Sequence, residues 1–160
     1  MTTALINKID DYPITPFGNQ LVWEAIVTVS AKQDLGAGPT GHRYIVPITG
    51  GSFRGGDGYE AFHGSVMAGG ADRQLLRPDG IKELCAIYEM QVHDGTILSI
   101  ENNVIVDTSV TNGRYAASRI HVTAPAGKWD WLNRRLFLGS LHSVHPNPGH
   151  VVIRGWEVTV

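Results

Sequence analysis

The sequence predicts an all-β protein built from about eight short antiparallel strands. Nineteen glycines and eight prolines divide the 160 residues into runs of about 8 to 13 residues that are rich in Val, Ile, Thr and aromatic side chains. No long apolar pattern at helical spacing interrupts these runs. Consecutive strands joined by short turns usually pair with each other, so the series predicts an up-and-down meander that closes into a barrel. An open two-sheet sandwich is the alternative fold.

The individual elements follow from the same runs. Strands are expected near residues 20–30, 42–49, 59–67, 82–93, 96–106, 115–123, 135–142 and 150–160. Asp94 and Gly95 have the chemistry of a two-residue turn, which predicts a hairpin between the fourth and fifth strands, and residues 111–114 predict a similar turn. Residues 128–134 are expected to make one short helical turn. We expect a single domain over residues 1–160, in which residues 1–18 form an N-terminal arm.

Composition excludes several classes of function. Thirteen basic residues stand against 15 acidic ones, which argues against binding to nucleic acid or to an anionic membrane. No run approaches the roughly 20 apolar residues of a membrane span, and the first residues lack the pattern of a secretory signal. The one cysteine, Cys85, is expected to be a buried small hydrophobe in a reducing compartment. We therefore expect a cytoplasmic protein whose partners are a small molecule and a second copy of itself, as a homodimer.

Strand parity predicts which side chains point inward, because successive residues of a strand face opposite sides. Along 82–93 the apolar face contains Tyr88 and Met90, and along 96–106 it contains Asn102. Trp23 and Phe62 join the same inner face from the first and third strands. A buried hydroxyl or amide left unpaired costs about 1–3 kcal/mol, so Tyr88 and Asn102 each need a partner inside. That partner is another side chain, a water molecule or a ligand.

Alternate loops of a meander lie at the same end of the barrel, which places Arg43 and Asp72 together at one mouth. Arg43 is positioned to hold a carboxylate with two parallel hydrogen bonds, or to form an ion pair with Asp72. Asp72 is either a proton-transfer group or a cap for the backbone of its own loop. Glu60 shares the face of Phe62, where burial raises a carboxyl pKa, but it lies near the start of its strand, where a rim position keeps the pKa ordinary.

Metal and cofactor signals are weak. His142, His145 and His150 are expected at the same mouth, but a catalytic zinc usually takes three protein ligands, and the strand spacing of the first two separates them, so we predict no metal site. The glycine clusters lack the phosphate-loop pattern, and no G-x-S-x-G elbow occurs. We expect no cofactor.

Four segments resemble the DUF3237 (UPF0311) family: GHRYIVPITGGSF, GSVMAGGADRQLLRPDG, the DG turn at 94–95, and KWDWLNRRLFLG. The resemblance runs from about residue 20 to the C-terminus, and GGAD at 69–72, followed by Asp79 and Gly80, is its most specific element. It implies a calycin-like barrel. It also implies a link to aromatic-compound catabolism, in which some members are implicated in decarboxylating lignin-derived acids without an evident cofactor. Val104, Cys85 and Ile87 depart from the family pattern and are expected to reshape the cavity.

These observations favour a cofactor-independent lyase of decarboxylase type, or an isomerase, that acts on an aromatic or apolar carboxylate inside the barrel. Arg43 would hold the acid, and Asp72 or Tyr88 would move a proton. The side chains expected to contact the substrate are Asn102, Trp23, Phe62, Met90 and Glu60. A binding barrel without chemistry is the alternative, and a filled structural domain is the third hypothesis.

Overall fold

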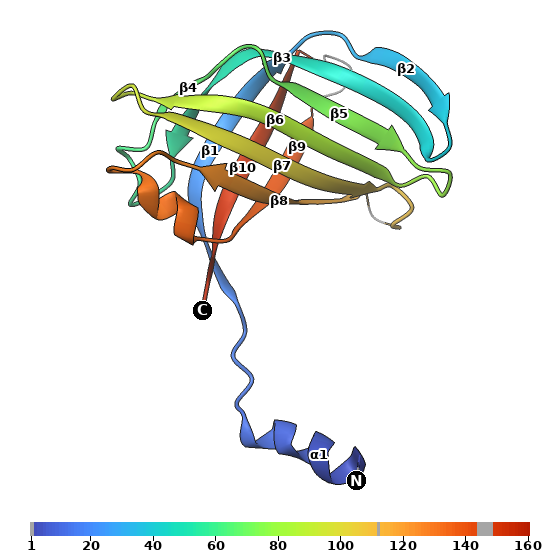
Figure 1. Cartoon of the computed structure of the whole chain (residues 1–160), viewed down its shortest axis with the longest axis vertical. Coiled ribbons are helices and arrows are strands. Elements are labelled where there is room, and N and C mark those ends of the chain that lie inside the picture. Colours follow the sequence, from blue (N-terminus) through green and yellow to red (C-terminus); the bar gives the residue numbers. More distant parts are fainter. Residues whose placement is uncertain (1, 112, 144–148) are drawn as a thin grey trace.

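Ten antiparallel strands form one continuous sheet in the computed structural model, which describes residues 2–111, 113–143 and 149–160 (Figure 1). The strands are β1 (Gly18–Val29), β2 (Gln33–Gly38), β3 (Gly41–Gly55), β4 (Gly64–Val66), β5 (Ala71–Leu76), β6 (Lys82–Val92), β7 (Ile97–Asp107), β8 (Tyr115–Thr123), β9 (Phe137–Ser143) and β10 (His150–Thr159). The short helices are α1 (Thr2–Ile6), η1 (Asn7–Asp11) and η2 (Asp130–Arg134).

The sheet closes into a barrel. From β6 to β10 each strand pairs with its neighbour in sequence, β10 pairs with β1, and β1 pairs with β3. β4 and β5 together occupy one place between β3 and β6, while β2 lies beside the first half of β3. The result is the predicted eight-stranded up-and-down barrel.

The predicted hairpin at Asp94 and Gly95 is confirmed. β6 and β7 pair up to Gln91 and Ile97, and Gly95 has a φ of 92°. Asp94 accepts a hydrogen bond from the backbone N–H of Thr96 at 2.9 Å and another from Nε1 of Trp129 at 2.8 Å. These two donors, the Thr96 N–H first, lower the pKa of Asp94 to about 2. The hairpin and η2 therefore meet at one end of the barrel.

Two strands were not expected. The segment from 71 to 76 was predicted as a loop but forms β5, and the predicted third strand shrinks to β4. β5 resembles a loop in sequence because its inward residues, Asp72 and Gln74, are polar like the outward Arg73, so apolar and polar side chains do not alternate there. β2 is equally inconspicuous because its sequence, QDLGAG, contains two glycines in six residues.

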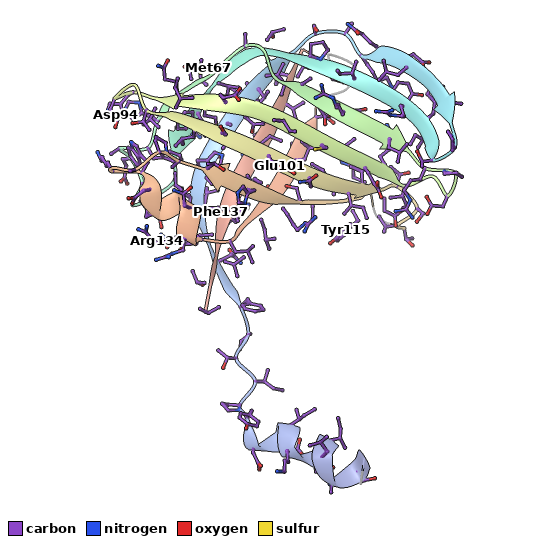
Figure 2. The ribbon with its side chains drawn as sticks, viewed as in Figure 1. Met67, Asp94, Glu101, Tyr115, Arg134 and Phe137 are labelled. Carbon is purple, nitrogen blue, oxygen red and sulfur yellow. The ribbon has the colours of Figure 1, made fainter. Side chains whose placement is uncertain are left out.

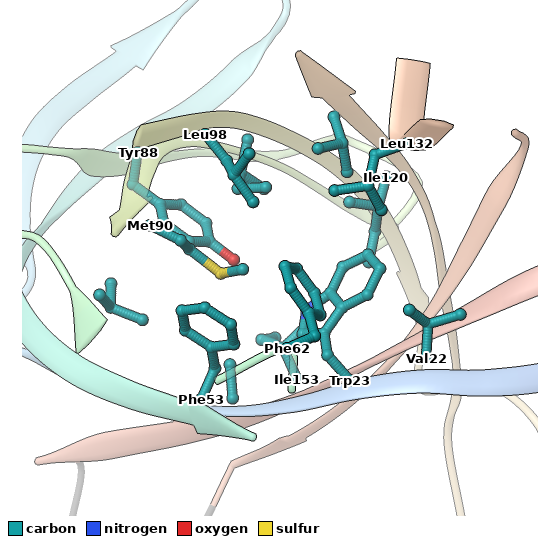
Figure 3. Close-up of a cluster of buried hydrophobic side chains, with 14 of the residues drawn as sticks. Val22, Trp23, Phe53, Phe62, Tyr88, Met90, Leu98, Ile120, Leu132 and Ile153 are labelled. Atoms are coloured by element: carbon teal, nitrogen blue, oxygen red, sulfur yellow. The ribbon is translucent and has the colours of Figure 1, made fainter. Parts of the chain in front are cut away.

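An aromatic core fills the end of the barrel near η2 (Figure 3). Phe62 packs against Phe53 at a ring-centroid distance of 5.0 Å and against Trp23 at 6.1 Å. Trp23 in turn meets Phe137 at 5.2 Å. Buried aromatic side chains of this size stabilise a fold by roughly 1.5–3 kcal/mol each. This end is solid, so open space inside the barrel lies farther from η2.

The N-terminal arm, α1 and η1, projects from the start of β1 and stands clear of the barrel (Figure 1). Its side chains are exposed from Thr3 to Phe17. Within the described ranges, the structure has no helix that is both long enough and apolar enough to cross a membrane.

Candidate functional site

A cavity of about 90 Å³ lies inside the barrel, between the aromatic core and the end that carries the β5–β6 turn. This volume is about three times the share of one molecule in liquid water. Four polar side chains face it: Asp72, Gln74, Tyr88 and Asn102. The rest of the wall is apolar and consists of Val27, Val29, Val46, Ile48, Leu84, Ala86, Val104, Leu141, Val151 and Ile153. A mostly apolar pocket with a few convergent polar groups is the usual form of a small-molecule site.

The strand register sets the spacing of the polar groups. Asp72 of β5 lies directly opposite Ala86 of β6, which lies directly opposite Asn102 of β7. Because neighbouring strands are about 4.8 Å apart, the backbones of Asp72 and Asn102 are separated by roughly 10 Å. The small side chain of Ala86 lies between them. Asp72 and Asn102 therefore stand on either side of a position where the cavity wall carries only a methyl group.

The GGAD segment explains why Asp72 points inward. Gly69 has a φ of 112°, which side chains with a Cβ rarely adopt, and a Cβ on Gly70 would lie 2.5 Å from the Cβ of Tyr88. The backbone N–H of Ile48 donates to the carbonyl of Gly70 at 2.9 Å, which fixes the chain against β3. β5 then starts at Ala71 and directs Asp72 into the barrel.

The Asp72 carboxyl group is only half satisfied. Its Oδ2 accepts a hydrogen bond from Nε2 of Gln74 at 2.8 Å, whereas its buried Oδ1 has no partner among the described residues. Burial raises the pKa of Asp72 above its ordinary value, and the hydrogen bond from Gln74 opposes part of this rise. Among the described residues the carboxyl group accepts a hydrogen bond from a side chain and from no backbone amide, so the structure does not bear out the interpretation of Asp72 as a loop cap.

Asn102 and Tyr88 complete the polar group. Asn102 is 2% exposed, and its Oδ1 likewise lacks a partner among the described residues. Tyr88 is also 2% exposed, and burial raises the pKa of its phenol far above the ordinary value, so the group stays neutral. Each unpaired buried acceptor costs about 1–3 kcal/mol. The cavity therefore offers two free acceptors and a neutral phenol to a bound molecule.

Arg43 does not belong to this site, contrary to the prediction. Val46 and Ile48 of β3 line the cavity, so the odd position of Arg43 places it on the outer face, opposite Leu75 of β5. The side chain is exposed there and lines a groove outside the barrel. The predicted ion pair with Asp72 is absent, because the two side chains lie on opposite sides of the sheet.

The other predicted contacts divide in two. Trp23, Phe62 and Met90 do point inward, but they are packed in the aromatic core and do not line the cavity. Glu60 lies on the surface, where it accepts a hydrogen bond from the backbone N–H of Gly58 at 2.9 Å. This bond lowers the pKa of Glu60, so neither the raised pKa considered for an inward position nor the ordinary pKa considered for a rim position is found.

The histidines gather no metal-binding set within the described ranges. His142 lies next to the last residue of β9, and His150 begins β10. His145 lies outside the described residues.

Gln74 is the site residue that the sequence prediction missed. It lies two positions after Asp72, so strand parity alone would have placed the two side chains on one face once β5 was recognised.

Fold and site together define a class: a closed up-and-down β-barrel with a small, partly polar internal cavity. The chain belongs to the family described as "Protein of unknown function (DUF3237)", whose model matches residues 19–158. This confirms the resemblance seen in the sequence.

Curated relatives carry only the family label. A UPF0311 protein of Rhodopseudomonas palustris is 32% identical over 117 residues, which cover 63% of this chain and 72% of that one. A UPF0311 protein of Clostridium acetobutylicum is 43% identical over 65 residues, or 41% of this chain and 39% of that one.

Solved structures agree with the fold. A protein of Clostridium acetobutylicum, described as having unknown function, superposes with a TM-score of 0.81 at 26% identity and covers 92% of this chain and 100% of that one. A β-barrel like protein of Acinetobacter baumannii gives 0.80 at 21% identity, with 92% and 99% coverage. At that identity the second likeness shows the fold alone.

Proposed function

We propose that this protein is a small-molecule enzyme that uses Asp72 to move a proton to or from a carbon atom of a largely apolar substrate, as a lyase of decarboxylase type or as an isomerase. The single observation that carries the proposal is the buried Asp72 carboxyl group, which faces a cavity with one oxygen unpaired. In this proposal the protein's own side chains supply the acid–base chemistry.

The raised pKa of Asp72 suits it to proton transfer near neutral pH, because more of the group carries its proton there than in an ordinary carboxyl group. In a decarboxylation the bond between the carboxylate and its carbon breaks, and carbon dioxide leaves. The electron pair stays on the substrate carbon, which takes the proton of Asp72, and water then returns a proton to Asp72. In an isomerisation Asp72 removes a proton from one carbon and delivers it to another.

The cavity wall indicates what the substrate carries. The free acceptors on Asp72 and Asn102 match a hydroxyl or phenol donor, and Tyr88 can donate a hydrogen bond in return. No lysine or arginine is among the described residues that line the cavity, so the proposal assigns Arg43 no part. A carboxylate in this desolvated wall would lack a compensating cation, which favours its loss as carbon dioxide.

The test is to incubate the purified protein in D₂O with phenolic and cinnamic-type acids and with the same compounds lacking the carboxyl group. Carbon dioxide release and deuterium incorporation at carbon are measured by gas analysis and NMR. A positioned acid typically contributes about 10²–10⁴-fold in rate, so Asp72→Asn should slow the reaction at least about 100-fold. Asp79→Asn, an exposed position on the β5–β6 turn, is the matched control and should keep the wild-type rate.

Two results would contradict the proposal that the protein is an enzyme that uses Asp72. If compounds raise the melting temperature but show neither release nor exchange, the protein is a binding barrel without chemistry. If Asp72→Asn and Asp79→Asn catalyse the reaction at the same rate, Asp72 is not the proton-transfer group.

We also propose that the protein forms a homo-oligomer and resides in the cytoplasm. The exposed apolar side chains of the N-terminal arm support the first part, and the single cysteine supports the second.

A further inference from the structure

A broad groove of about 730 Å³ runs across the outer face of the barrel, over β5 to β9. Its apolar lining includes Leu75, Ala117 and Leu138, with the half-buried Cys85 among them in the sheet. Tyr115, at the start of β8, also lines the groove (Figure 2). A hollow that combines apolar and charged side chains is suited to a partner with both kinds of group.

Three unpaired arginines line the groove. Arg43, Arg73 and Arg119 are exposed, and none forms an ion pair with any residue in the described ranges. Glu83 is the one acidic lining residue, and Arg77 already pairs with it at 3.2 Å. Two such grooves placed face to face would oppose like charges. The occupant therefore has to bring apolar side chains together with negative charge.

The N-terminal arm has both properties. Leu5, Ile6 and Ile9 are between 57% and 70% exposed, although they are large and apolar. Asp10 and Asp11 end η1 immediately after them. Within the described ranges, the contacts of α1 with other elements are chiefly those with η1. The arm is therefore an exposed apolar segment with an acidic end, and Lys8 is its one basic side chain.

Length and direction favour a groove on another copy. α1 and η1 together extend about 17 Å, and β5 to β9 span roughly 19 Å at the usual strand spacing. The chain leaves η1 extended at Tyr12, with φ −112° and ψ 124°, and Pro13 and Pro16 keep the linker from turning back as a helix. Figure 1 shows the arm pointing away from its own barrel.

We propose that the N-terminal arm of one copy docks in the outer groove of a second copy. Leu5, Ile6 and Ile9 would cover the apolar side chains of the groove, and the two aspartates would pair with its arginines. This inference rests on the proposed homo-oligomer and is independent of the chemistry at Asp72, so cross-linking can fail while activity is retained, and the reverse.

Cys85 offers a direct test, because it is the chain's one cysteine and lines the groove. The full chain with Ile9→Cys is oxidised with copper phenanthroline, run on a non-reducing gel and digested for mass spectrometry. We expect covalent dimers that contain a peptide pair linking the new cysteine to Cys85. Asp57→Cys, exposed in the turn after β3, is the matched control and should give at least tenfold less dimer.

Three outcomes would overturn the proposal: no disulfide, a disulfide confined to monomers, or equal dimer from Asp57→Cys. The charge pairing has its own test. Asp10→Lys with Asp11→Lys should reduce the cross-link several-fold, and adding Arg73→Glu with Arg119→Glu should restore it. A cross-link that ignores these changes would contradict the ionic contact.

Discussion

Replacing Asn102 by leucine is expected to stabilise the protein while it abolishes ligand binding. Asn102 is 2% exposed, and its Oδ1 has no partner in the described chain, so the wild-type fold carries the cost of an unpaired buried acceptor. Leucine has a similar size and removes that cost, which is about 1–3 kcal/mol. In a chain of this length each kcal/mol corresponds to roughly 2–4 °C in melting temperature. The variant should therefore melt about 2–12 °C higher.

The assay is thermal unfolding followed by circular dichroism, with urea titration to obtain the free energy of unfolding. Asn103→Leu is the control: Asn103 lies on the opposite face of β7, where it donates to Glu101, and its replacement should change stability by no more than about 0.5 kcal/mol. A lower melting point for Asn102→Leu would refute the reasoning, because it would mean that the amide is satisfied inside the barrel.

Three further outcomes follow from the structure. Burial raises the folded-state pKa of Asp72, so wild-type stability falls as pH rises from the unfolded pKa near 4. The melting temperature of Asp72→Asn minus that of the wild type should therefore increase between pH 4 and pH 8. A constant difference would argue against the raised pKa. Trp129→Phe removes one of the donors that lower the pKa of Asp94, so an NMR titration should find that pKa above about 2; an unchanged value would show that the indole is not a significant donor. Gly70→Ala should destabilise the fold by about 1–3 kcal/mol in urea unfolding, because the new Cβ meets Tyr88; a neutral effect would contradict that packing.

Strand parity predicted the interior well wherever side chains alternate in the ordinary way. β6 and β7 begin and end within one residue of the predicted strands. Strand parity also predicted correctly that Tyr88 and Asn102 point inward. The hairpin at Asp94 and Gly95 was equally predictable, since a tight turn needs residues of that kind.

The prediction failed where polar side chains point into the barrel. β5 directs Asp72 and Gln74 into the barrel and Arg73 outward, so periodicity alone reads it as a polar loop. Reading β5 as a loop also placed Arg43 beside Asp72 at a rim. In the structure Asp72 pairs with Val46, and Arg43, three residues from Val46, points to the other face of the sheet. The side chains that line the cavity and those that form the core both point inward. Strand parity therefore cannot tell that Asn102 lines the cavity whereas Met90 packs in the core.

The central claim, that the cavity between Asp72 and Asn102 receives a hydroxyl-bearing molecule, is tested most directly by a crystal structure of the protein grown with phenol. We expect the ring inside the barrel, with its oxygen 2.6–3.2 Å from a carboxyl or amide oxygen of these two residues. Phenol found elsewhere, or an interior closed by the wall's own side chains, would contradict the account.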